Sequence, residues 1–173
     1  DTEYYRDWFT FAETRPVEDR YIVDADAEFV ADYLMAVYTP DIERYNDQHG
    51  TDYGSYGEIV LADRVPDSPG LERDDWEYFV RSELRLDFIR LDPSLAGSFR
   101  EFLNSQLYAT IGEFNARFDT DHEDFDEVEF HVQAPQDRVL QADWEKFLKD
   151  SAACPSEMIR VWGSRQLFEE FIA

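Results

Sequence analysis

Apolar residues recur every three or four positions between residues 93 and 118, and this spacing constrains the fold more than any other feature of the chain. Pro93 can begin a helix, since proline at the first helical position loses no hydrogen bond, and Asp92 can cap it. We therefore expect one long helix over about 93–118 with one buried face. That face carries Phe99, Phe102, Leu103, Leu107, Ile111, Phe114 and Phe118.

Shorter apolar patterns predict a mixture of helices and strands. Helical spacing predicts further helices over 26–38, 142–150 and 164–172, and strand-like runs occur at 58–62, 127–132 and 157–162. The run over 73–91 begins with helical spacing and ends in alternation. Strands that mix irregularly with helices predict the α+β class, here a small, mostly antiparallel sheet of three to four strands covered by helices.

The length of 173 residues suits one compact domain, 1–173, and the 43% hydrophobic content is enough for a buried core. Glycine and proline gather in 48–70, which we interpret as a loop region inside that domain. We find no internal repeat in the sequence. A single acidic α+β domain is therefore expected.

The chain has 40 acidic against 16 basic residues, a net charge of −24. With no basic stripe, such a field repels phosphate, so direct binding of nucleic acid or of an anionic membrane is not expected. Two explanations of the charge stay open. Proteins that work in concentrated salt carry dense acidic surfaces, and so do proteins that bind a cationic partner.

Targeting signals and disulfides are not indicated by the sequence. The single cysteine, Cys154, excludes an internal disulfide and suits a reducing compartment. No apolar run is long enough to span a membrane, and the first residues lack the pattern of a signal peptide. We expect a cytoplasmic location, and the sequence leaves the oligomeric state open.

The densest charge lies in residues 119–131, DTDHEDFDEVEFH, which contain no lysine or arginine. If extended, residues 119–129 would span about 36 Å, or one charge per roughly 5 Å, against one phosphate per about 3.4 Å along a DNA strand. The stretch is either a solvated connector or a surface for a basic partner. The partner-binding candidates are Asp119, Asp121, Glu123, Asp124, Asp126, Glu127 and Glu129.

The same stretch offers a candidate site for a divalent metal. On a strand over 127–132, Glu129 and His131 would share a face, and His122 could complete the ligands. A calcium loop starting at Asp119 is excluded, because Asp124 stands where glycine is needed and Phe130 where a bidentate glutamate is needed. No other cofactor is indicated.

Catalytic motifs are not found in the sequence. Cys154 lies among small neutral residues, and the chain holds no glycine-rich phosphate loop, nucleophile elbow or H-E-x-x-H pattern. Forty carboxylates make close pairs unavoidable, so such pairs do not indicate a glycosidase. We assign no catalytic residue and consider a non-enzymatic role the better expectation.

Charge and composition together favour an inhibitory or binding protein that presents carboxylates to a basic site of a partner, one that itself binds nucleic acid. DNA-mimic inhibitors, anti-defence proteins and immunity proteins use this charge strategy. The alternative is a protein of other function adapted to high salt, with a divalent-metal-dependent enzyme as one form. Two further acidic segments, 17–33 and 71–83, could extend the surface if the fold gathers them.

Overall fold

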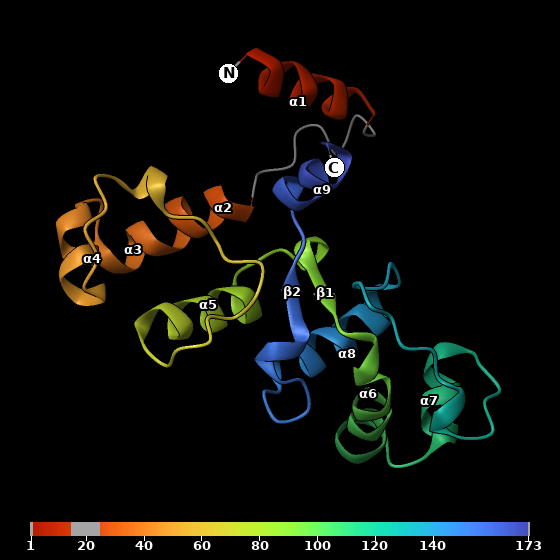
Figure 1. Ribbon diagram of the computed structural model, residues 1–173. Coiled ribbons are helices and arrows are strands. Elements are labelled where there is room, and N and C mark those ends of the chain that lie inside the picture. Colours follow the sequence, from red (N-terminus) through yellow and green to blue (C-terminus); the bar gives the residue numbers. More distant parts are fainter. Residues whose placement is uncertain (1, 15–24, 173) are drawn as a thin grey trace.

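The computed structural model describes residues 2–14 and 25–172, and these are mostly helical (Figure 1). The helices are α1 (Thr2–Thr14), α2 (Ala25–Ala27), the π-helical η2 (Glu28–Leu34), α3 (Met35–Tyr38), α4 (Ile42–His49), α5 (Leu71–Ser82), α6 (Ala96–Phe102), the π-helical η6 (Leu103–Leu107), α7 (Ile111–Phe118), α8 (Arg138–Lys149) and α9 (Ser164–Ile172). Five 3-10 turns are η3 (Tyr56–Glu58), η4 (Leu86–Phe88), η5 (Pro93–Leu95), η7 (Phe125–Glu127) and η8 (Ser156–Met158). No helix in the described ranges is long and apolar enough to cross a membrane.

The sheet is smaller than predicted. In the part of the chain that the structure describes it consists of β1 (Ile89–Leu91) and β2 (Ile159–Val161), paired antiparallel. The α+β class is consistent with this arrangement, but the expected three to four strands are not found. The runs at 58–62 and 127–132 are not strands, although Ile59, Leu61 and Val128 are buried as an alternating pattern predicts.

The helix predicted over 93–118 is interrupted. Helix α6 and η6 end at Tyr108, whose backbone is extended, and α7 begins after Thr110. The Thr110 side chain accepts a hydrogen bond from the backbone N–H of Glu113, and the Glu113 carboxylate accepts one from the N–H of Ala109. These two bonds resemble a capping box, with the glutamate reaching the residue before the N-cap, and they start a new helix although the apolar spacing continues across the break.

The expectation that the chain holds no internal repeat is wrong. Residues 25–91, the first unit, and residues 95–161, the second unit, contain the same elements in the same order: a helix with a π-helical segment, a short helix with a loop, a longer helix, a 3-10 turn and a strand. The sequence D-W-E-x-F occurs in both longer helices, at 75–79 in α5 and at 143–147 in α8. The chain is an internal duplication.

The equivalent tryptophans make the same hydrogen bond in both units. The indole N–H of Trp76 donates to the carbonyl of Ala62, and that of Trp144 donates to the carbonyl of His131, both at 2.8 Å. Each indole is at most 1% exposed. Each tryptophan therefore holds the loop of its own unit against the longer helix.

The preceding aspartates are also equivalent. Asp75 accepts a hydrogen bond from the Tyr38 hydroxyl at 2.6 Å, and Asp143 accepts one from the Tyr108 hydroxyl. Both aspartates are buried. The same tyrosine to aspartate bond thus ties the first helical segment of each unit to its longer helix.

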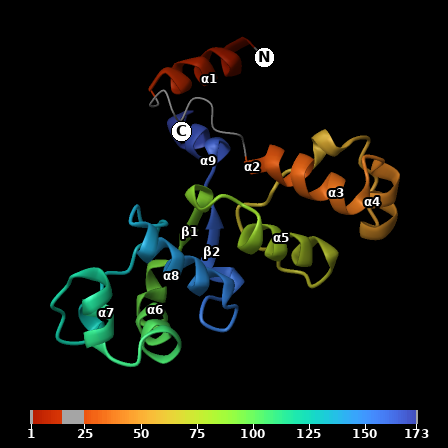
Figure 2. The same ribbon diagram turned by 180° about the vertical axis from the view of Figure 1, so that it is seen from behind.

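The two units meet about a pseudo-twofold axis at the strand pair, where Arg90 lies opposite Arg160. Strand residue Leu91 of the first unit donates its N–H to Val132 of the second at 2.8 Å, and Val161 of the second donates to Asp63 of the first at 2.9 Å. Figures 1 and 2 show α4 and α5 on one side of the strands and α6 and α7 on the other, with α1 and α9 together at one end.

Candidate functional site

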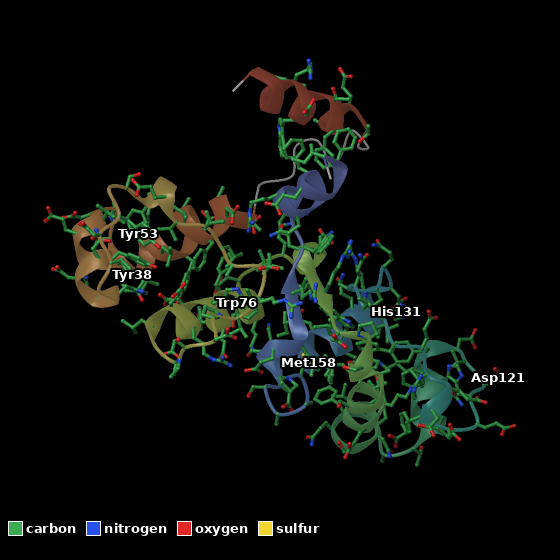
Figure 3. The ribbon with its side chains drawn as sticks, in the orientation of Figure 1. Tyr38, Tyr53, Trp76, Asp121, His131 and Met158 are labelled. Carbon is green, nitrogen blue, oxygen red and sulfur yellow. The ribbon has the colours of Figure 1, made fainter. Side chains whose placement is uncertain are left out.

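The acidic loop, defined as residues 119–129, connects α7 to the segment that leads into α8. All seven of its carboxylate residues are exposed. Figure 3 shows Asp121 at the outer edge of the molecule, beyond α7. The predicted partner-binding residues are therefore accessible, and the remaining question is what holds them in place.

Asn115, in the last turn of α7, organises the start of the loop. Its side-chain oxygen accepts hydrogen bonds from the Thr120 hydroxyl at 2.8 Å and from the backbone N–H of His122 at 3.2 Å. Its amide nitrogen donates to the carbonyl of His122 at 2.9 Å. Asp119 adopts the left-handed conformation, φ 54°, that ends the helix. One side chain thus closes the whole turn.

The first unit builds its loop with the same contacts. The Asn46 side-chain oxygen accepts from the Thr51 hydroxyl at 2.9 Å and from the Tyr53 N–H at 3.0 Å, and its amide donates to the Tyr53 carbonyl at 2.9 Å. Gly50 takes the left-handed position, φ 67°, that Asp119 occupies in the second unit. The loop 50–60 is therefore the structural counterpart of the acidic loop.

Two of the seven acids have structural roles. Asp124 caps the turn η7 by accepting the backbone N–H of Asp126, and Glu127 accepts the N–H of Glu123, both at 2.8 Å. In the first unit, the backbone N–H of Gly54 donates the equivalent hydrogen bond to the Glu58 carboxylate. Among the described residues, five loop carboxylates make no hydrogen bond or ion pair: Asp119, Asp121, Glu123, Asp126 and Glu129.

The acidic loop is not extended, so the premise of a straight row of charges is wrong. The chain bends at Asp119 and again at η7, where Phe125 packs edge-on against Phe114 with ring centroids 6.1 Å apart. Val128 is 3% exposed and anchors the far end. The carboxylates therefore form a cluster on a bent loop rather than a line with the spacing of phosphates.

The three candidate metal ligands are placed by different contacts. His122 lies with its Nδ1 3.8 Å from Glu127, and Glu129 and His131 line an open hollow of ≈ 630 Å³ before α8. The strand on which Glu129 and His131 were expected to share a face does not form. Within the described ranges, no three His, Cys, Asp or Glu side chains are grouped to hold a metal ion.

The other acidic segments do not adjoin the acidic loop. Residues 71–82 form α5 of the first unit, on the opposite side of the strands from α7 in both views (Figures 1 and 2). The part of the segment 17–33 that lies in the described residues belongs to α2 and η2, which pack with α5. Within the described residues, the acidic loop on the second unit's outer edge is therefore separate from both of these segments.

A buried polar cluster in the first unit was not found from the sequence. The hydroxyls of Tyr33 and Tyr38 donate to the two oxygens of Asp75 at 2.8 and 2.6 Å. Burial, reinforced by the neighbouring carboxylate, raises the pKa of both tyrosines, so they stay protonated donors. His49 lies 3.3 Å from Asp75, and burial lowers its pKa. No local spacing indicates this cluster, because its members are far apart in sequence.

The second unit places Phe118 where the first has His49, which predicts that His49→Phe folds well. Burial holds the pKa of His49 below its ordinary value of 6.5, against the opposing attraction of Asp75. As the pH falls below about 6.5 the unfolded chain takes up this proton before the folded one does, so the free energy of unfolding decreases. We expect His49→Phe to remove this part of the acid sensitivity.

Urea unfolding of both proteins between about pH 7.5 and 5 measures the effect, since the free energy of unfolding of the variant should fall less steeply over that window. The matched control is His122→Phe, which changes a partly exposed histidine in the equivalent loop of the other unit. Equal pH slopes for the wild type and His49→Phe would contradict a neutral, buried His49.

Comparison with known proteins finds no match: no protein family, no curated protein and no solved structure is similar to this chain. The geometry of the site is therefore what bears on function. The two units provide an internal comparison, because they share one framework and differ in the side chains that they expose.

Proposed function

We propose that the acidic loop presents its carboxylates to a basic site on another protein, one that itself binds nucleic acid, and inhibits it by occupying that site. The observation that carries the proposal is the contrast between the two equivalent loops. Loop 50–60 has two acids and the acidic loop has seven, although the same asparagine network holds both. The framework is shared and the exposed charge is not.

The five added acids stand at positions where the first unit has uncharged residues. The pairs are Gly50 and Asp119, Gly54 and Glu123, Ser55 and Asp124, Gly57 and Asp126, and Val60 and Glu129. All ten positions are exposed. Adaptation to a salty solvent acts on every exposed surface and would acidify both loops. A surface selected for one partner accounts better for a change confined to one of them.

Physical chemistry sets what such a loop contributes. Exposed charges attract a basic partner over distances of about a Debye length, roughly 8 Å at physiological salt, so they raise the association rate and weaken as salt rises. Because the loop is pinned by Asn115 and Phe125, little chain entropy is lost when it docks. The proposed interaction is therefore fast and salt-sensitive.

The sharpest test neutralises four of the five loop carboxylates that make no hydrogen bond or ion pair, and leaves Asp119, whose backbone ends α7. The variant Asp121→Asn/Glu123→Gln/Asp126→Asn/Glu129→Gln leaves Asp124 and Glu127 to hold the turn. A partner captured from lysate at low salt, identified, and titrated as the purified protein should bind this variant about tenfold more weakly or worse, because each exposed ion pair contributes about 0.2–1 kcal/mol.

The matched control removes the same charge from exposed acids of the first unit: Asp47→Asn/Asp52→Asn/Asp63→Asn/Asp67→Asn. We expect the control to keep most of the affinity. An equal loss in both variants would show that net charge, not the acidic loop, drives binding. If the wild type instead unfolds as KCl falls toward about 0.1 M, the charge is adaptation to salt and the proposal fails.

A further inference from the structure

The pattern D-W-x-x-F occurs a third time, at residues 7–11 in α1. Its aspartate precedes the equivalent aspartate in α5 by 68 residues (7 to 75), and that one precedes the aspartate in α8 by 68 residues (75 to 143). Helix α1 therefore has the sequence of the last helix of a unit. The same spacing relates all three copies.

Helix α9 has the position of the first helix of a unit. It follows β2 in the chain as α6 follows β1, and its Phe168 and Phe171 are spaced like Phe99 and Phe102 of α6. Figures 1 and 2 show α1 packed beside α9, and α9 is also tied to α2 by a 3.2 Å bond from Arg165 to Asp26. The first and last described helices thus come together as a unit's last and first helices do.

The aromatic contacts are the same in all three helix pairs. In each, the phenylalanine that ends D-W-x-x-F contacts two rings one helical turn apart on the partner helix. The centroid distances are 5.0 and 5.7 Å from Phe79 to Phe29 and Tyr33, 5.2 and 5.5 Å from Phe147 to Phe99 and Phe102, and 5.6 Å from Phe11 to each of Phe168 and Phe171.

We propose that α1 and α9 are the two helices of a third unit, and that α9 accepts α1 from a second copy of this chain as well as from its own. In the complete units the pair is also held by the loop between its helices, which buries the tryptophan. The α1–α9 pair has no such loop in the described ranges. Trp8 is only partly buried, and Phe9, Phe171 and Ile172 are 68%, 44% and 50% exposed.

The structure favours a second copy of this chain as the occupant, because the Phe168 and Phe171 rings of α9 fit a helix that carries D-W-x-x-F. Helices α5 and α8 carry that pattern too, but their tryptophans and phenylalanines are already buried in their own units. Among the described helices with this pattern, only α1 can exchange without opening the main core, because its buried contact between Phe11 and Phe168 lies outside that core. Exchange joins the α1 of one copy to the α9 of the next, a head-to-tail contact that concentration promotes.

Cross-linking between marked copies tests the exchange in the full chain. One preparation carries Phe11→Cys, the other carries Phe171→Cys, and the native Cys154 is buried in both. After mixing at high concentration and mild oxidation, we expect a disulfide-linked dimer of one copy of each. The double variant Phe11→Cys/Phe171→Cys at low concentration should give a monomer closed by an internal disulfide. Thr10→Cys, on the exposed side of α1, replaces Phe11→Cys in the control and should not form the dimer.

A closed double variant without any mixed dimer would overturn the exchange and leave α1 bound only to its own copy. Absence of both products would overturn the third unit itself. Light scattering of the unmodified chain is a second measurement that does not depend on the cysteine variants being folded. If α1 exchanges between copies, the average mass of the unmodified protein should rise with concentration. A constant monomer mass would count against exchange. Neither result depends on the acidic loop, so this proposal and the proposed function can fail separately.

Discussion

Trp144→Ala is expected to destabilise the protein by about 3–5 kcal/mol, the cost of replacing a fully buried tryptophan by alanine. The substitution opens a cavity inside the second unit and leaves the carbonyl of His131 without its 2.8 Å hydrogen bond. Equilibrium unfolding in urea measures the loss. Because Trp76 has the same burial and the same bond in the first unit, Trp76→Ala should cost a similar amount.

Trp8→Ala provides the matched control at the third copy of the motif. Trp8 packs on one side against Phe168 of α9 and is otherwise partly exposed to solvent. Its removal should therefore cost less than half as much as the loss of Trp144. Equal costs for all three tryptophans would contradict the distinction between two complete units and one bare helix pair.

Asn115→Ala is expected to cost about 2–3 kcal/mol, since it removes three hydrogen bonds of about 1 kcal/mol each. Asn46→Ala should cost nearly the same, because the first unit holds its loop with the same three bonds. Urea unfolding gives the free energies. Hydrogen exchange at the N–H of His122 or of Tyr53 shows which loop has opened in each variant.

The control for this pair is Thr120→Val, which removes one of the three bonds and should cost about 1 kcal/mol or less. If Asn115→Ala were as mild as Thr120→Val, the asparagine would not organise the acidic loop. If only one of the two asparagine variants were destabilised, the units would not be energetically equivalent.

Much of the helical structure could be predicted from the spacing of apolar residues. The helix predicted over 142–150 is part of α8, and that over 164–172 coincides with α9. In the ambiguous run over 73–91 the first part belongs to α5, whereas the alternating residues 84–88 lie in a turn and in η4, and β1 begins only at Ile89. The break at Tyr108 was missed because the apolar spacing continues across it, while the signal that ends the helix is the T-x-x-E capping box at 110–113.

The strands could not be predicted equally well, because a strand is defined by its partner. The predicted strand over 157–162 contains β2, which pairs with β1. The run over 127–132 has the same alternation, yet its backbone meets β1, in the described residues, only where Leu91 donates to the Val132 carbonyl, next to an isolated bridge at Gln133. Alternation places Val128 in the core without supplying a neighbouring strand.

The duplication was missed because the shared residues are few and widely spaced. The loops have in common an asparagine, a threonine, an aspartate and a glutamate, while most exposed positions have diverged. The matching tryptophans and aspartates are 68 residues apart in the sequence. The tryptophans are recognised as equivalent by their hydrogen bonds to the carbonyls of Ala62 and His131. The aspartates are recognised by the bonds that they accept from Tyr38 and Tyr108. The two units therefore keep the same buried contacts although most of their exposed side chains differ.

The sequence by itself determined the net charge, the exposure of the carboxylates in 119–129 and the positions of most helices, because these depend on composition and on local periodicity. Only the tertiary structure decided that those residues form a bent loop, that Asp124 and Glu127 hold it, and that a counterpart with only two acids exists at 50–60. The bonds that hold the two loops join residues two to seven positions apart within one unit. Whether they form depends on the backbone conformation of the folded turn, which the spacing of apolar residues does not specify.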